Sequence, residues 1–203
     1  MKKEENLKRC VNTKTLAKIG VLSAVATVAM LLEFPLPFAP SFYELDFSEV
    51  PVLIGAFALG PVAGVFIELI KILLNFVLNG TVTAGVGEIG NLLIGCSLIV
   101  PAAIIYRRNK SFKSAIIGLI VGIVSLAIVG ALLNYYLLLP VYSTAFGAPL
   151  QAFVDMGNAL NKYIVDVKTL VLYAVVPFNL VKGIIVSVLT ILIYKRISPI
   201  LHR

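Results

Sequence analysis

The sequence predicts an all-α integral membrane protein with six transmembrane helices and both termini in the cytoplasm. Three observations lead to this fold class: 60% of the 203 residues are apolar, only 13% are charged, and the basic residues gather beside apolar stretches. Soluble domains average about 25% charged residues, whereas one membrane-spanning helix needs about 20 mostly apolar residues. This composition excludes a disordered chain, a disulfide-stapled secreted domain and a soluble catalytic domain of typical size.

The first predicted span covers residues 15–33 and follows a short basic tail, residues 1–14. The run Phe34-Pro35-Leu36-Pro37 ends this helix, because proline cannot continue it. The segment 34–47 then carries no basic residue, so we expect it to lie outside the cell.

The next apolar stretch, residues 49–79, is interrupted by Gly60-Pro61. The piece before this break reaches only about 17 Å, which is less than the roughly 30 Å of a hydrocarbon core. A single crossing would put the basic cluster at 107–113 on the side opposite the basic N-terminus, whereas two crossings keep every basic cluster cytoplasmic. We therefore expect two short or steeply placed helices that turn at Gly60-Pro61.

Three further spans are expected at residues 88–106, 114–139 and 167–194. Between the last two lies a segment of mixed character, residues 140–166, in which 150–163 suits a short interfacial helix. The whole chain, 1–203, is then a single membrane domain.

Several functions are excluded by the sequence. The net charge of +7 reflects membrane topology rather than nucleic-acid binding, because the basic residues flank the spans. Cys10 and Cys96 form no plausible disulfide or metal pair, and His202 is the only histidine. The chain has no G-x-x-x-x-G-K-[ST] or H-E-x-x-H motif, so we expect neither an enzyme nor a bound metal or cofactor. Gly85–Gly90 matches G-x-G-x-x-G, but no strand precedes it, so a tight turn or close ligand approach explains its glycines.

Polar residues within spans are rare and mark binding sites or pathways. Lys182 lies deep in the last span, with Asn179 three residues earlier on the same face, and no carboxylate within helical reach neutralises it. We interpret this pair as ligand contacts. Asn134, in the outer half of the fifth span, is by itself better explained by an interhelical hydrogen bond.

Three other features each allow two interpretations. Glu68 and Lys71 are either a structural ion pair or the ion-coupled pair of a transporter. The small residues Gly20 and Ala24 form a small-xxx-small face that serves internal packing or docking of another membrane protein. The segment 34–47 either packs on the helix ends or folds over a flat ligand as a lid. Its apolar and aromatic residues are Phe34, Leu36, Phe38, Phe42, Tyr43 and Phe47.

Four runs of residues carry a family likeness. They are Glu44-Leu45-Asp46-Phe47-Ser48-Glu49-Val50-Pro51, Gly60-Pro61-Val62-Ala63-Gly64, Leu133-Asn134-Tyr135 and Pro177-Phe178-Asn179-Leu180-Val181-Lys182-Gly183. Together they resemble the riboflavin-specific substrate-binding component (S component) of energy-coupling factor (ECF) transporters. The likeness extends over nearly the whole chain, from the first helix to the last.

This resemblance implies a six-helix membrane protein that binds riboflavin from outside the cell. It further implies a transmembrane coupling subunit and two ABC-type ATPases as partners. The substrate-binding positions that it implies are Leu36, Phe38 and Tyr43 over the ring and ribityl chain, and Asn134, Asn179 and Lys182 at its polar groups. Whether FMN is also accepted is left open.

In the family, an Ala-x-x-x-Ala pattern on the first helix contacts the coupling subunit. The nearest match here is Gly20-x-x-x-Ala24, which departs in its first residue but keeps the close approach.

Three alternatives remain compatible with the sequence. The first is an S component for another vitamin, such as thiamine or a pterin. The second is a stand-alone secondary transporter with Glu68 and Lys71 as its ion-coupled pair. The third is a structural or assembly membrane protein that binds no ligand.

Overall fold

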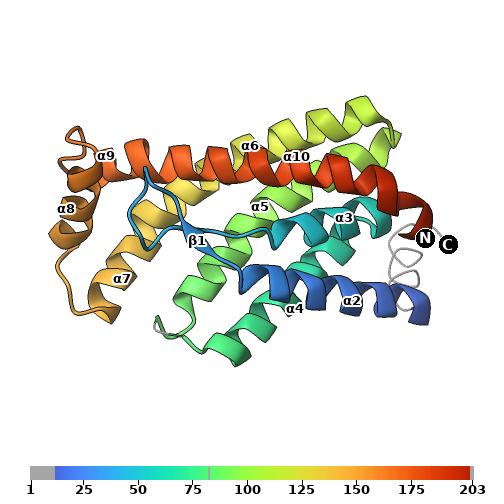
Figure 1. Cartoon of the computed structure of the whole chain (residues 1–203), viewed down its shortest axis with the longest axis horizontal. Coiled ribbons are helices and arrows are strands. Elements are labelled where there is room, and N and C mark those ends of the chain that lie inside the picture. Colours follow the sequence, from blue (N-terminus) through green and yellow to red (C-terminus); the bar gives the residue numbers. More distant parts are fainter. Residues whose placement is uncertain (1–11, 82, 202–203) are drawn as a thin grey trace.

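The computed structural model describes residues 12–81 and 83–201, and helices dominate its architecture (Figure 1). In chain order, its elements are α2 (Thr13–Met30), β1 (Phe34–Pro35), β2 (Glu44–Leu45), α3 (Glu49–Leu59), α4 (Pro61–Asn79), α5 (Val86–Asn109), α6 (Phe112–Leu133), the π-helical turn η1 (Asn134–Leu138), α7 (Leu139–Ala145), α8 (Leu150–Leu160), α9 (Val167–Leu170), the π-helical turn η2 (Val171–Val175) and α10 (Val176–Leu201). The expected all-α fold class is confirmed. Most of the basic tail (residues 1–11, with Cys10) and His202 lie outside the described residues.

Five stretches of the described residues are long and apolar enough to cross a membrane. They are Thr13–Met30, Pro61–Asn79, Val86–Asn109, Phe112–Ala145 and Val167–Tyr194. The one expected span missing from this set is the second in chain order. It corresponds to α3, whose 11 residues reach only about 17 Å. The predicted break between α3 and α4 is confirmed: Gly60 has a φ of 107°, which favours glycine, and Pro61 begins α4.

Two π-helical turns interrupt the last two long stretches, where the sequence predicts uninterrupted helices. The turn η1 joins α6 to α7, and η2 joins α9 to α10. The two turns contact each other. A π-helical turn inserts an extra residue into the helix and redirects the side chains around it, and such turns are frequent at functional sites.

The segment that follows α2 is a folded hairpin rather than a solvated loop. The helix α2 ends at Met30, earlier than the expected residue 33, so Glu33 belongs to the loop. The strands β1 and β2 pair antiparallel, with Phe34 opposite Leu45. Tyr43 and Leu45 are buried in an apolar cluster. The other members of this cluster include Leu139, Phe153, Leu170 and Phe178, from α7, α8, α9 and α10. The hairpin therefore covers one end of the helix bundle.

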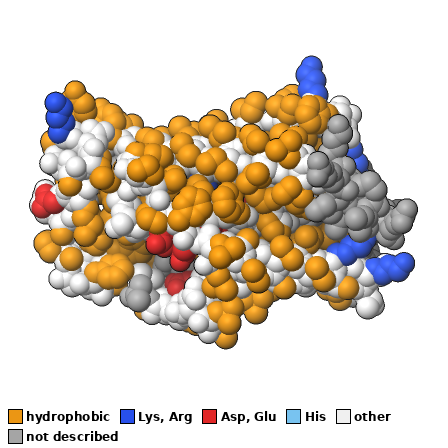
Figure 2. All heavy atoms as spheres, in the orientation of Figure 1, with side chains coloured by type: hydrophobic (Ala, Val, Ile, Leu, Met, Phe, Trp, Pro, Cys, Tyr) orange, Lys and Arg blue, Asp and Glu red, His pale blue; other side chains and the backbone are white. Residues whose placement is uncertain are grey.

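The two ends of the bundle differ in chemistry. The start of α2, the end of α10 and the turns α3–α4 and α5–α6 lie at one end (Figure 1). A β-carbon on Gly60 would lie 3.2 Å from an Arg107 guanidinium nitrogen, so these two turns are neighbours. The hairpin, α7 and α8 lie toward the opposite end. Apolar side chains cover most of the face between the ends, as expected of a surface in contact with lipid (Figure 2).

A buried ion cluster holds α3 against α4. Lys71 Nζ lies 3.0 Å from Glu49 Oε1 and 2.8 Å from Glu68 Oε2, and it donates to Ser48 Oγ at 3.1 Å. The Lys71 and Glu68 side chains are completely buried. Of the two interpretations of Glu68 and Lys71, this geometry favours the structural tie between helices.

Replacing Lys71 with methionine is expected to destabilise the protein by about 3–5 kcal/mol, because Glu49 and Glu68 would stay buried without a counter-charge. Thermal unfolding of the purified protein in detergent micelles measures this loss. Lys113→Met is the matched control, since Lys113 is exposed in the first turn of α6. Equal stability of the two variants would argue against a structural role for the cluster.

Candidate ligand-binding site

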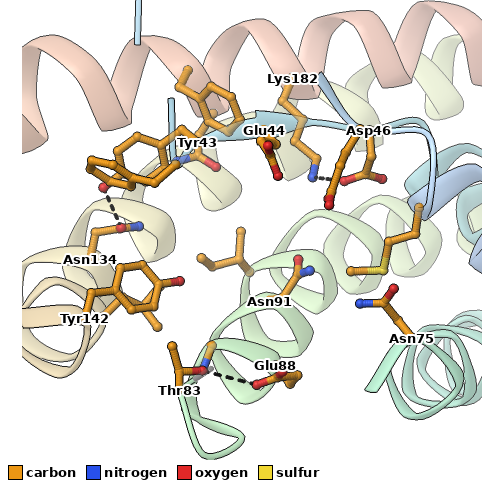
Figure 3. A pocket seen from close by; sticks show the side chains of 18 of the residues that line it. Tyr43, Glu44, Asp46, Asn75, Thr83, Glu88, Asn91, Asn134, Tyr142 and Lys182 are labelled. Carbon is orange, nitrogen blue, oxygen red and sulfur yellow. Dashed lines mark hydrogen bonds and ion pairs between the residues drawn. The ribbon is translucent and has the colours of Figure 1, made fainter. Parts of the chain in front are cut away.

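A cavity of about 430 Å³ lies beneath the hairpin. Its walls come from the hairpin, the end of α2, α4, the start of α5, η1, α7 and α10 (Figure 3). Apolar side chains such as Phe42, Leu138 and Phe178 line it together with carboxamides, carboxylates and one ammonium group. A small-molecule site has this composition: apolar surface for most of the ligand, and a few polar groups that fix its orientation.

The structure brings four of the six predicted substrate-binding residues together. Tyr43, Asn134, Asn179 and Lys182 all line the cavity. Leu36 and Phe38 are not among its lining residues. Leu36 packs against the apolar cluster of the hairpin, and Phe38 is 38% exposed. The hairpin therefore contributes the expected Tyr43, together with Phe42, Glu44 and Asp46, whereas Leu36 and Phe38 lie outside the cavity lining.

Lys182 has a partner that sequence reasoning missed. Its Nζ lies 2.9 Å from Asp46 Oδ2, and both side chains are largely buried. Helical spacing indicates only partners in the same helix, whereas Asp46 stands 136 positions away, in the hairpin. In the sequence, this partner was indicated only by an acidic residue in a segment without basic residues. This ion pair links α10 to the hairpin.

The carboxylate of Asp46 stays ionised. Burial by itself would raise the pKa of Asp46, but the positive charges of Lys182 and Lys71 and a hydrogen bond with Ser48 together hold it well below its ordinary value. The Ser48 backbone N–H donates to Asp46 Oδ1 at 2.7 Å. Asp46 therefore connects the cavity to the first turn of α3.

The two carboxamides are oriented by their own helices. Asn134 Nδ2 donates to the Gly130 carbonyl at 2.8 Å, and Asn179 Nδ2 donates to the Val175 carbonyl at 2.9 Å. A carbonyl oxygen can only accept, so these contacts establish which end of each amide is nitrogen. Each amide keeps a second N–H and oxygen lone pairs with which to bind a ligand.

Tyr43 fixes the other end of the Asn134 amide. Its hydroxyl donates to Asn134 Oδ1 at 2.8 Å. Burial, followed by the nearby Tyr142, raises the pKa of Tyr43 well above its ordinary value, so the hydroxyl stays protonated. Tyr43, expected as a cover for the ligand, thus also positions a polar group.

The wall opposite Lys182 was not predicted. It includes Asn75, Thr83, Glu88 and Asn91 (Figure 3). Glu88 Oε2 accepts from Thr81 at 3.2 Å and from Thr83 at 3.4 Å. In the sequence, the signal for this wall was the glycine-rich run that contains Glu88. The prediction of a tight turn in this run is confirmed, because Gly85 has a φ of 89°.

Carboxylates dominate the charge of the cavity. Glu33, Glu44, Asp46 and Glu88 line it beside the single ammonium of Lys182. Partial burial and the neighbouring charges of Glu44 and Asp46 raise the pKa of Glu33. Acidic side chains gather in one place on the otherwise apolar face (Figure 2). Within the described residues, no group of three His, Cys, Asp or Glu side chains could hold a metal ion.

The predicted docking residues lie away from the cavity. Gly20 and Ala24 are exposed on α2, and a β-carbon on Gly20 would meet no atom within 4 Å. Ser23 and Thr27, in contrast, are buried and donate to the carbonyls of Ile19 and Ser23. One face of α2 therefore packs inside the bundle, and Gly20 and Ala24 lie on an exposed face.

These features define a multi-pass membrane protein that encloses a cavity suited to a small molecule at one end of its helix bundle. Residues 14–194 match the family described as the substrate-specific component of ECF transporters, and the chain belongs to this family.

Known proteins of similar sequence cover nearly the whole chain. Riboflavin transporter RibU of Staphylococcus aureus (strain TCH60) is 39% identical over 190 residues, which make up 94% of this chain and 93% of that protein. Riboflavin transporter FmnP of Bacillus subtilis (strain 168) is 33% identical over 190 residues, with 93% and 94% covered. These relatives are transporters rather than enzymes.

A solved structure has the same fold. It is described as the structure and mechanism of the S component of a bacterial ECF transporter. Its TM-score is 0.72 at 37% identity, and the match covers 94% of this chain and 98% of that one.

Replacing Asp46 with asparagine is expected to loosen the hairpin, because Lys182 would lose its counter-charge and stay largely buried. A broken buried pair costs about 3–5 kcal/mol. Hydrogen exchange followed by mass spectrometry measures the protection of backbone amides in residues 34–48. Asp155→Asn is the control, since Asp155 is exposed on α8.

The pH dependence of this protection follows from the lowered pKa of Asp46. A carboxylate with a lowered folded pKa stabilises the folded state above its unfolded pKa of about 3.9, and this stabilisation is lost only as the pH falls through the folded pKa. Protection factors of the wild-type hairpin should therefore be equal at pH 8 and pH 5. A marked loss at pH 5 would show that the pair is not what holds the hairpin.

Proposed function

We propose that this chain is the riboflavin-binding S component of an ECF transporter and takes up the vitamin from outside the cell. The observation that carries the proposal is the convergence of oriented carboxamides (Asn134 and Asn179) and the Lys182–Asp46 pair on one cavity. Relatives that cover nearly the whole chain are named riboflavin transporters, which supports the same ligand.

The chemistry of riboflavin suits this cavity. Its three fused rings are flat and largely apolar, and they end in an imide edge that alternates acceptor, donor and acceptor. Carboxamides offer both donors and acceptors to such an edge, and an ammonium group donates to a carbonyl or hydroxyl oxygen. The carboxylates and the wall of Thr83, Glu88 and Asn91 offer acceptors to the hydroxyls of the ribityl chain.

Six spans in a single membrane domain, with both termini in the cytoplasm, are part of this proposal. The positive-inside rule places the end that carries Arg107, Arg108 and Lys110 in the cytoplasm. The cavity and the hairpin then lie on the outer side. In this arrangement α3 counts as a short span, and the hairpin covers the part of the membrane that α3 does not reach.

The sequence contains no Walker motif, so ATP hydrolysis for transport would be the task of partner subunits. We propose a coupling subunit in the membrane and two ABC-type ATPases, as the family implies. The exposed Gly20 and Ala24 face of α2 suits close approach of a helix of the coupling subunit.

A stand-alone secondary transporter is less well supported. Glu68 and Lys71 would have to exchange ions with solvent, yet both are completely buried and paired with each other. Lys71 is also tied to Glu49. An S component for another vitamin remains the main competitor, and direct binding separates the two.

Riboflavin should bind the purified protein with quenching of flavin fluorescence, whereas thiamine should not compete. Asn134→Ala and Asn179→Ala should each weaken riboflavin binding about tenfold to hundredfold, because an unmet buried hydrogen bond costs about 1–3 kcal/mol. Asn109→Ala, at an exposed position near the opposite end of the bundle, is the control. Full affinity in both cavity variants would refute this site.

Gly20→Leu should leave riboflavin binding intact and abolish uptake by cells. The larger side chain has space within this chain but would block close approach of a partner helix. Val124→Leu, at an exposed position on α6, should affect neither. Binding and uptake are measured separately, by fluorescence titration and with radiolabelled vitamin. Loss of binding in Gly20→Leu would instead make this face part of the internal packing.

A further inference from the structure

Gly130 lies one turn before η1 and contacts both carboxamides of the site. Its carbonyl oxygen accepts from Asn134 Nδ2 at 2.8 Å. On its other side, a β-carbon would lie 2.7 Å from Asn179 Nδ2 and 3.0 Å from Asn179 Cγ. Gly130 itself is not among the residues that line the cavity.

The Asn179 amide cannot easily move away from residue 130. It is 4% exposed, and its Nδ2 donates to the Val175 carbonyl at 2.9 Å. Real β-carbons essentially never lie closer than 3.0 Å to another heavy atom, so any side chain at 130 must displace the amide. That displacement changes the direction of the amide and weakens the hydrogen bond to Val175.

We infer that Gly130 is a positioning residue of the ligand site. Its missing side chain lets the Asn179 amide lie against α6, and its carbonyl fixes the Asn134 amide. Both amides are thereby presented to the imide edge of the ligand. This inference rests on the proposed function, because it assigns the two amides to the ligand.

The geometry of the two helices supports this role. Asn134 is the first residue of η1, and Val175, which holds Asn179, is the last residue of η2. The two π-helical turns contact each other, and Gly130 and Asn179 meet beside them. A residue without a side chain is needed where α6 comes this close to the Asn179 side chain of α10.

The test is a double-mutant cycle on riboflavin affinity. Gly130→Ala is expected to weaken riboflavin binding about tenfold to hundredfold, as the loss of one hydrogen bond to Asn179 would. Asn179→Ala should weaken it to a similar degree. In the Asn179→Ala background, Gly130→Ala should add less than about twofold, because the amide that it displaces is gone.

This cycle stays informative if Gly130→Ala alone does not fold. The shorter side chain of Asn179→Ala makes room for the new methyl group, so the double variant and Asn179→Ala can be compared directly. A double variant about tenfold weaker than Asn179→Ala would overturn the inference, since Gly130 would then act by another route.

The infrared carbonyl stretches of bound riboflavin provide a readout that general loosening does not move. They should shift to higher frequency in Gly130→Ala and in Asn179→Ala alike, because a hydrogen bond to the imide edge is lost. Unchanged stretches in Gly130→Ala, together with weakened binding, would also overturn the inference.

Gly157→Ala is the matched control. A β-carbon there would also lie 2.7 Å from the tip of a buried side chain, Leu170 Cδ1, but neither residue lines the cavity. This variant should bind riboflavin within about twofold of the wild type. An equal loss in both glycine variants would reduce the effect of Gly130 to general packing. If the unmodified protein does not bind riboflavin, the proposed function fails, and the inference fails with it.

Discussion

The ion pair between Lys182 and Asp46 is the contact on which the site depends. An ammonium group within a membrane span is stable only with a partner, and here that partner comes from the hairpin rather than from a neighbouring helix. The pair draws residues 34–48 down onto α10, and the same segment brings Tyr43 to Asn134. The continuing chain brings Ser48 and Glu49 to Lys71. The need to neutralise two buried lysines therefore also shapes the roof of the cavity.

Much of the fold was predictable because each span appears in the sequence as a long apolar run, with basic residues beside several of these runs. The all-α class, the break at Gly60-Pro61 and a helix within residues 150–163 follow from apolar runs, proline, glycine and the positive-inside rule. The π-helical turns did not follow, because one extra residue in a helix leaves no period in the sequence. The length of α2 was overestimated, since Leu31 and Leu32 continue its apolar pattern although the helix ends at Met30.

The residues of the candidate site were predictable where polar side chains interrupt apolar spans. They were not predictable where the conformation of a loop determines which side chains line the cavity. Asn134, Asn179 and Lys182 stand out against apolar neighbours, and the structure brings all three to one cavity. Asp46 and Glu88 give only a weak signal, because acidic residues are ordinary in loops and at helix starts. Leu36 and Phe38 are implied by the resemblance alone, and which hairpin residues face inward depends on the register of β1 and β2. That register is a tertiary property, fixed by contacts with α7 to α10.

The short length of α3 determines how deep in the membrane a bound ligand lies. In the proposed orientation, with the basic end at the cytoplasmic boundary, the 11 residues of α3 span about 17 Å of a hydrocarbon layer roughly 30 Å thick. The hairpin must therefore sink below the outer boundary, where irregular backbone is tolerated only against protein or around a cavity. A molecule held under it already rests well inside the low-dielectric layer. In that orientation, the remaining path to the cell interior is correspondingly shortened before the proposed ATPase partners act.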